Sequence, residues 1–173
     1  MMCAAQAGQR GRRVALIDHA AVIGEKIRIS GGGRCNFTNV HASPAQYLSR
    51  QPDFCADALA RYTAADFVAL VERHRIPYHE KKLGQLFCDR SAHDIIAMLK
   101  DECARGRVTW YAPCAVQGVQ HDGSGFAIAT AQGALRASSL VVATGGLAVP
   151  KVGATPFAYR LAEQFGLAVV PPR

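Results

Sequence analysis

The sequence predicts an α/β fold in which helices flank a parallel sheet and a small antiparallel meander is inserted. Two short apolar runs bounded by polar residues, 14–17 and 107–111, have the pattern of buried parallel strands. Between residues 114 and 137, β-prone runs are separated by the turn signals Asp-Gly-Ser-Gly (122–125) and Gln-Gly (132–133), which predict three antiparallel strands. Parallel strands interrupted by such a meander are the layout of a Rossmann-like domain that binds FAD or NAD(P).

Helix signals occupy the segments between the predicted strands. Ser43 before Pro44 indicates one helix start, and Thr63 caps a helix over residues 64–74. Ser91 caps a longer helix that runs to residue 105. Further helices are expected at residues 1–9, 57–61 and 157–165.

Two other segments are expected to be extended. Residues 76–87 contain a proline and a glycine among charged residues, which favours short extended pieces around a turn. Within them, Glu80, Lys81 and Lys82 are interpreted as a solvated charge run. Residues 140–143 are predicted to form another buried strand, just before the Thr-Gly-Gly turn at 144–146.

The stretch from residue 24 to residue 39 is the strongest functional feature. Its three consecutive glycines, 31–33, have no side chains to bury, and their usual role is to let backbone N–H groups approach a ligand. The surrounding cations are Lys26, Arg28 and Arg34, and the surrounding small polar residues are Ser30, Asn36, Thr38 and Asn39. This combination suits an anionic ligand such as a phosphate ester. A flexible surface loop is the alternative, and composition leaves both interpretations open.

Asp18 directly follows the first predicted strand. In a dinucleotide-binding βαβ unit, an acid at the end of the second strand binds the adenosine ribose, about twenty residues after a Gly-x-Gly-x-x-Gly turn. Counting back by about that distance passes residue 1, so the first strand and its glycine turn are expected to be missing. Without the neighbouring glycine loop, a solvated acid at a strand end would be the simpler explanation of Asp18.

Residues 29–39, Ile-Ser-Gly-Gly-Gly-Arg-Cys-Asn-Phe-Thr-Asn, resemble the signature loop of the YhiN/BaiN-type flavoproteins. These are FAD-dependent oxidoreductases with a glutathione-reductase-like nucleotide-binding fold. The resemblance extends to residues 13–18, 143–146 and 159–166 and therefore runs nearly end to end. It implies an FAD-dependent oxidoreductase with NAD(P)H as the candidate electron donor. The substrate stays open, because the family includes an aminoacetone oxidase and a reductase of oxo-steroid bile acids.

The resemblance implies cofactor-binding residues and assigns no catalytic residue, because the flavin ring carries the hydride chemistry. Asp18 would hold the adenosine ribose, and the backbone of Val116 would meet the adenine. The turn over the dinucleotide would be formed by Thr144, Gly145 and Gly146. The pyrophosphate and ring side would be lined by Lys26, Ser30, Gly31, Gly32, Gly33, Arg34, Cys35 and Asn36. Arg34 matches phosphate geometry best, and a plain surface arginine is its alternative.

Two departures from the family pattern are visible. Pro156 and Ala158 stand where the family has a flexible glycine-containing turn, and both disfavour the backbone freedom of such a turn. The family also continues past residue 173 into a substrate-side domain. The sequence therefore predicts a single incomplete FAD-binding domain over residues 1–173.

The cysteines and histidines point away from a metal centre. The six cysteines contain no Cys-x-x-Cys pair, which argues against a zinc site or a redox dithiol and fits a reducing cytoplasm. His74 and His79 are separated by Pro77 and do not share a helical face, so no metal site is predicted there. For Cys35, a need for a small residue is favoured over a redox or nucleophilic role.

The net charge of +7 would permit a nucleic-acid partner, but the basic residues are scattered and no nucleic-acid motif is present. We therefore expect a small-molecule substrate, no nucleic acid and, because no run is long and apolar enough, no membrane. The oligomeric state is not predicted. Two alternatives to an oxidoreductase stay open: an inactive or protein-binding remnant of such a flavoprotein, and a basic nucleic-acid-binding module that only the charge supports.

Overall fold

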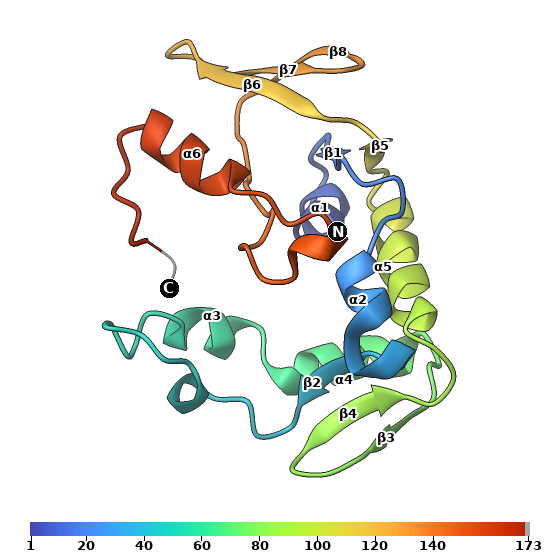
Figure 1. The fold of residues 1–173 in the computed structure, drawn as a ribbon. Helices are drawn as coiled ribbons and strands as arrows, with labels where there is room; N and C mark the ends of the chain where they lie inside the picture. The colour runs from blue at the N-terminus through green and yellow to red at the C-terminus, as the bar shows by residue number, and fades with distance from the viewer. Residues whose placement is uncertain (172–173) are drawn as a thin grey trace. The chain divides into compact units, whose positions relative to one another are not determined.

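The computed structural model describes residues 1–171 and confirms the mixed α/β class (Figure 1). This part of the chain divides into two compact units. The first contains residues 1–14 and 24–108, and the second contains residues 15–23 and the chain from residue 109 onward.

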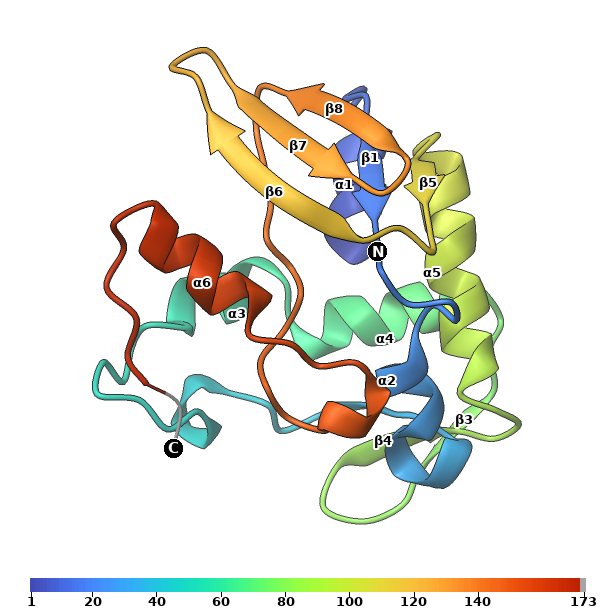
Figure 2. The same ribbon diagram turned by 45° about the horizontal axis from the view of Figure 1, so that its top comes forward.

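The first unit contains five helices, which are labelled in Figure 2, and a three-stranded antiparallel sheet in the order β2-β4-β3. The helices are α1 (Met2–Gln9), α2 (Glu25–Ile29), α3 (Ala56–Arg61), α4 (Ala64–Arg73) and α5 (His93–Arg105). The strands are β2 (Asn36–Asn39), β3 (Tyr78–Glu80) and β4 (Gln85–Cys88), with short 3-10 turns at Ser30–Gly33 and Pro44–Gln46.

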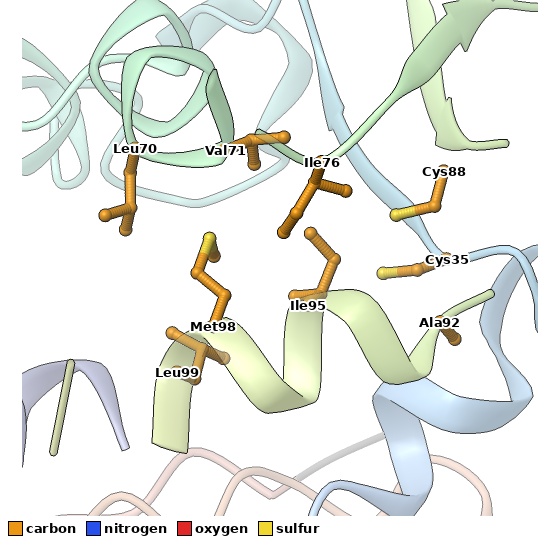
Figure 3. Packing of buried hydrophobic residues seen from close by; sticks show 9 residues of the cluster. All are labelled: Cys35, Leu70, Val71, Ile76, Cys88, Ala92, Ile95, Met98 and Leu99. Carbon is orange, nitrogen blue, oxygen red and sulfur yellow. The ribbon is translucent and has the colours of Figure 1, made fainter. Parts of the chain in front are cut away.

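The core of the first unit lies where α5 meets α4 and the inner face of the sheet (Figure 3). Helix α5 buries Ile95, Met98 and Leu99 on one side, at the spacing expected for a helix packed against a core. Helix α1 lies along α5, and the Gln9 side chain donates a hydrogen bond to the Glu102 carboxylate at 2.8 Å. The core therefore fixes the sheet and the loop that precedes β2.

The second unit contains the parallel pair and the meander that the sequence predicted. Strand β1 (Ala15–Ile17) pairs in parallel with β5 (Thr109–Tyr111). Strands β6 (Val116–His121), β7 (Phe126–Thr130) and β8 (Gly133–Ala137) form an antiparallel sheet in chain order. A 3-10 turn (Pro150–Val152) and helix α6 (Phe157–Gln164) follow, and Leu161 of α6 packs with Val119 and Ile128 of the meander.

The cap at Thr63 is confirmed. Its hydroxyl accepts a hydrogen bond from Asp66 N at 3.1 Å, and its own N–H donates to the Asp66 carboxylate at 2.7 Å, which completes a capping box. At the start of α5 the boundary is shifted by one residue, because Ala92 is the cap residue. The Ser91 hydroxyl still accepts a hydrogen bond from His93 N at 3.1 Å.

Two predicted elements are wrong. Residues 140–143 form no strand: their apolar side chains suit one, but the backbone has no ladder partner within the described chain, and Val141 and Val142 are 64% and 44% exposed. The helix predicted from Ser43 is only the 3-10 turn Pro44–Gln46. Its cap is formed, but the following residues offer no buried face to sustain a helix, since Leu48 is fully exposed.

Candidate functional site

The glycine loop is ordered by its own backbone. Helix α2 runs directly into the 3-10 turn, and the Ser30 hydroxyl donates a hydrogen bond to the Ile27 carbonyl at 2.8 Å. Gly31, Gly32 and Gly33 follow with φ angles of 57°, 68° and 85°, which residues with a side chain adopt only with strain. Cys35 N then donates back to the Ser30 carbonyl at 3.1 Å, which closes the loop. Glycine therefore avoids backbone strain at all three positions.

The first two glycines have different surroundings. A Cβ on Gly31 would lie 2.6 Å from Cε1 of Phe87 and 2.8 Å from Asn36 N, so this glycine is packed against β4 and the start of β2. A Cβ on Gly32 would meet nothing within 4 Å. Gly31 is thus needed by the fold, whereas the backbone at Gly32 is open to a ligand.

The residues after the glycines are tied to β4 and to the start of α5. Ala92 N donates to the Gly33 carbonyl at 2.7 Å, and Cys88 N donates to the Arg34 carbonyl at 2.9 Å. The Arg34 guanidinium donates through Nη1 to the Asp89 carbonyl at 2.7 Å, which leaves its other N–H groups exposed. The amide of Asn36, oriented to donate, reaches the carbonyls of Thr38 and Leu86 at 3.1 and 3.2 Å.

The charges around the loop are not equivalent. Arg28 is paired with Glu25 through two contacts of 2.7 and 2.8 Å, and that neighbour lowers the pKa of Glu25. Lys26 and Arg34 are exposed and take part in no ion pair within residues 1–171. These two cations are the ones that a phosphate ligand could bind.

Cys35 has the environment of a packing residue. It is 5% exposed, its side chain belongs to the first core, and its sulfur lies beside that of Cys88 (Figure 3). Burial raises the pKa of the Cys35 thiol, with partial compensation from a hydrogen bond to Ser30, and burial raises the pKa of Cys88 to about 12. Thiols with raised pKa values are poor nucleophiles at neutral pH, which favours the interpretation that this position needs a small residue.

Asp18 lies at the carboxyl end of β1 in the second unit. Its backbone N–H donates to the Tyr111 carbonyl at 3.0 Å, and its carbonyl accepts from Cys114 N at 2.7 Å. One carboxylate oxygen accepts a hydrogen bond from Ala20 N at 2.9 Å. The side chain is partly exposed, so the other oxygen is able to accept from a ribose hydroxyl.

Val116 begins β6, two residues after the Cys114 that bonds to Asp18. It pairs with Thr130, and a bulge interrupts the ladder between Val116 and Gly118. A bulge disrupts the regular pairing of its strand, which suits a backbone group that is expected to contact an adenine. The structure therefore brings Asp18 and the start of β6 to the same edge of the second unit.

The turn at 144–146 has no regular secondary structure and lies against α6. Gly145 has a φ of 72° and open space around it, and a Cβ on Gly146 would be 3.1 Å from the hydroxyl of Tyr159. The positions that depart from the family pattern lie at the start of the same helix, with Pro156 as its cap residue and Ala158 within it. Both residue types suit a helix start.

Sequence reasoning missed a cluster of side chains on the outer face of the β2-β4-β3 sheet, beside the glycine loop. We call it the Phe87 cluster; it consists of Phe87, His79, Lys81 and Asp89. The His79 ring stacks on Phe87 at 6.3 Å between centroids, and the Lys81 ammonium lies 5.3 Å from the centroid of the Phe87 ring. Lys81 therefore contacts an aromatic ring, whereas the sequence indicated only a solvated charge run. Alternation along β3 was the available signal, since Tyr78 faces the core and His79 faces outward.

The predicted cofactor residues thus fall into two groups. Those of the glycine loop, from Lys26 to Asn36, belong to the first unit, and Asp18, Val116 and the turn at 144–146 belong to the second. Within residues 1–171 no group of three or more metal-ligating side chains is present, and no helix is long and apolar enough to cross a bilayer. The assignment of these residues to a cofactor stays a prediction.

Two curated relatives match the whole of this chain. The ribosomal RNA dihydrouridine synthase of Escherichia coli K12 is 53% identical over 173 residues, and that of Haemophilus influenzae is 47% identical over 177 residues. The 3-dehydro-bile acid delta(4,6)-reductase of Clostridium scindens is 26% identical over 161 residues, or 92% of this chain. The chain spans 43%, 44% and 39% of the lengths of these three relatives.

Solved structures share the fold at low sequence identity. NikD, an unusual amino acid oxidase essential for nikkomycin biosynthesis, matches 94% of this chain and 50% of its own, with a TM-score of 0.51 and 14% identity. Glycine oxidase from Bacillus cereus matches 86% of this chain and 54% of its own, with a TM-score of 0.53 and 16% identity. The model of the HI0933-like protein Rossmann domain matches residues 1–172, and the chain belongs to that family.

Proposed function

We propose that the chain is the FAD-binding part of a flavin-dependent reductase that converts uridine to dihydrouridine in ribosomal RNA. The observation that carries this proposal is the identity of 53% and 47%, over the whole chain, to two relatives named for that activity. The 26% identity to a bile acid reductase supports only the more general statement that the chain is part of a flavoprotein oxidoreductase.

The chemistry of the reaction fits a flavin. Dihydrouridine forms when the C5=C6 bond of uracil takes up a hydride and a proton, and a reduced flavin supplies hydride. The chain has residues that fit such a cofactor. The exposed backbone at Gly32, the free guanidinium N–H groups of Arg34 and the ammonium of Lys26 suit a pyrophosphate, and the available carboxylate oxygen of Asp18 suits a ribose. NAD(P)H is the proposed source of the electrons.

This proposal departs from the expectation of a small-molecule substrate without nucleic acid. That expectation rested on the scatter of basic residues along the sequence. The fold nevertheless places Arg34 and Lys81 around the same cluster, since Arg34 bonds to the carbonyl of Asp89 and Lys81 lies over Phe87. Scattered cations can therefore form a local basic surface, which an RNA substrate needs for its phosphates.

The test uses a chimera in which this chain replaces the matching segment of the Escherichia coli relative. The purified chimera should show a bound flavin spectrum and, with NAD(P)H, should form dihydrouridine in unmodified ribosomal RNA, read by mass spectrometry of the nucleosides. The Arg34→Ala variant should retain less flavin, whereas Arg107→Ala, an exposed arginine outside the loop, serves as the matched control. A folded chimera that binds and reduces FAD but forms no dihydrouridine would contradict the proposed substrate.

A further inference from the structure

We propose that His79, oriented by Asp89, is the proton donor to the uracil ring; this inference rests on the proposed function. His79 Nδ1 and Asp89 Oδ1 are 2.6 Å apart. The two side chains are 46% and 43% exposed, so an RNA base can reach them. Within residues 1–171, Nε2 of His79 makes no hydrogen bond and is the ring nitrogen available to a substrate.

The pair is held in place by the sheet. His79 in β3 is directly opposite Phe87 in β4, and the two rings are within 19° of parallel. Asp89 follows β4 directly, and its N–H donates to the Pro77 carbonyl at 3.0 Å. Backbone hydrogen bonds thus hold the main chains of both residues, and the contacts with Phe87 and Asp89 orient the imidazole.

The pair also adjoins the glycine loop. Phe87, on which His79 stacks, is the residue against which Gly31 packs. Asp89, which holds His79, has its carbonyl bonded to the guanidinium of Arg34. The predicted flavin loop is therefore linked to the His79–Asp89 pair through Phe87 and through the bond from Arg34 to Asp89.

The reaction needs a proton at C5, and a general acid beside the base would supply it. Reduction of uracil breaks the C5=C6 π bond: C6 takes up a hydride, which a bound reduced flavin would supply, and C5 takes up a proton. In our assignment the Nε2–H bond of the His79 imidazolium breaks as the C5–H bond forms, which leaves a neutral imidazole and an oxidised flavin. Asp89 is a positioning residue: by accepting from Nδ1–H it holds the orientation of the ring. Lys81, over the Phe87 ring, is placed to bind a phosphate beside the base.

The alternative is an exposed ion pair that merely joins β3 to the end of β4, and the test is designed to separate the two. The FAD-loaded chimera is first reduced with dithionite, and oxidation of its flavin by unmodified ribosomal RNA is followed by stopped-flow absorbance. The variants are His79→Gln, His79→Gly, Asp89→Asn and, as the matched control, His93→Gln. His93 is also exposed, and its ring nitrogen likewise bonds to a neighbouring side chain, the Ser91 hydroxyl at 3.0 Å.

Loss of a general acid typically slows a reaction by about 10²–10⁴-fold. We expect His79→Gln to slow flavin oxidation within that range, Asp89→Asn to slow it less, and His93→Gln to leave it unchanged. Free imidazole should restore part of the rate to His79→Gly. Dithionite reduction and RNA affinity, measured by fluorescence anisotropy, should be within about twofold of the parent for all variants.

A second readout needs no flavin chemistry. In spectra of chains labelled with ¹⁵N-histidine, the Nε2 resonance of His79 should shift when a uridine-containing oligonucleotide is added, and an abasic oligonucleotide should not shift it. The inference would be overturned by a His79→Gln rate within threefold of the parent, or by a slow His79→Gly variant that imidazole does not rescue. In either case, dihydrouridine formation by the parent would still support the proposed function. A parent chimera that forms no dihydrouridine would overturn both.

Discussion

Alanine substitutions at Gly31 and Gly32 should destabilise the chain to different degrees. Both positions have positive φ, so each alanine carries a backbone strain of about 1 kcal/mol. Gly32→Ala adds nothing more, because its new methyl group would meet no atom within 4 Å. Gly31→Ala also places a methyl 2.6 Å from the Phe87 ring and 2.8 Å from a backbone nitrogen. Overpacking of this kind costs about 1–3 kcal/mol, so the total expected for Gly31→Ala is about 2–4 kcal/mol.

The assay is urea unfolding of the 173-residue chain and its two variants, followed by far-UV circular dichroism. With a slope of about 2 kcal/mol per molar urea, Gly32→Ala should lower the midpoint by about 0.5 M and Gly31→Ala by about 1–2 M. Equal midpoints for the two variants, or a larger loss for Gly32→Ala, would refute the assignment of Gly31 to packing. For FAD affinity we expect a larger loss, relative to the loss of stability, in Gly32→Ala than in Gly31→Ala. The reason is that only the methyl group on residue 32 would project into the open space where a ligand could bind.

Three further predictions concern the cores and the thiols. Glu102→Gln should reduce the free energy of unfolding by about 2 kcal/mol at neutral pH. Burial raises the pKa of Glu102, but the hydrogen bonds from Gln9 and His74 have the larger combined effect and lower that pKa. A carboxyl with a lowered pKa contributes its full stabilisation only above its pKa in the unfolded state. The difference in free energy of unfolding between the parent and Glu102→Gln should therefore narrow below about pH 4.3. A difference that stays constant in acid unfolding would argue against this role of Glu102. Leu161→Ala should cost about 2–5 kcal/mol in thermal unfolding because the side chain is 6% exposed, whereas Leu167→Ala, at 63% exposure, should change stability by less than about 0.5 kcal/mol. Cys3 should react rapidly with a thiol reagent, whereas Cys35 should react only on unfolding, because Cys3 is exposed and burial raises the pKa of Cys35. Rapid labelling of Cys35 in the folded chain, detected by peptide mapping, would contradict this prediction.

Features that depend on neighbouring residues were predictable from the sequence. The cap at Thr63 needs only Asp66, three residues later, and the turns of the meander need only their own Gly-containing segments. That β1 and β5 are strands of a parallel sheet was also predictable, because short apolar runs between helical segments are typical of such strands, but the sequence did not show that these two pair with each other. These features confirm the fold class.

Features that depend on a distant partner were not predictable. Residues 36–39, Asn-Phe-Thr-Asn, resemble a loop by composition, and they form β2 because β4, much later in the chain, pairs with them. Residues 140–143 are the reverse case, since an apolar run suited to a strand has no partner within the described chain. His79 and Lys81 were assigned no role for the same reason, because their shared face is defined by Phe87 in the neighbouring strand.

The glycine loop shows why a motif cannot be assigned to ligand binding as a whole. From the sequence, the three glycines have the same explanation, which is close approach of a ligand to the backbone. In the structure, contact with Phe87 already accounts for Gly31, so its lack of a side chain says nothing about a ligand. Gly32 has positive φ and no neighbour that would exclude a methyl group, and Gly33 has only a backbone oxygen at 4.0 Å. At these two positions no neighbouring atom excludes a side chain, and the open backbone is able to approach a bound anion. Substitution of Gly32 or Gly33 should therefore affect cofactor binding more than the stability of the fold.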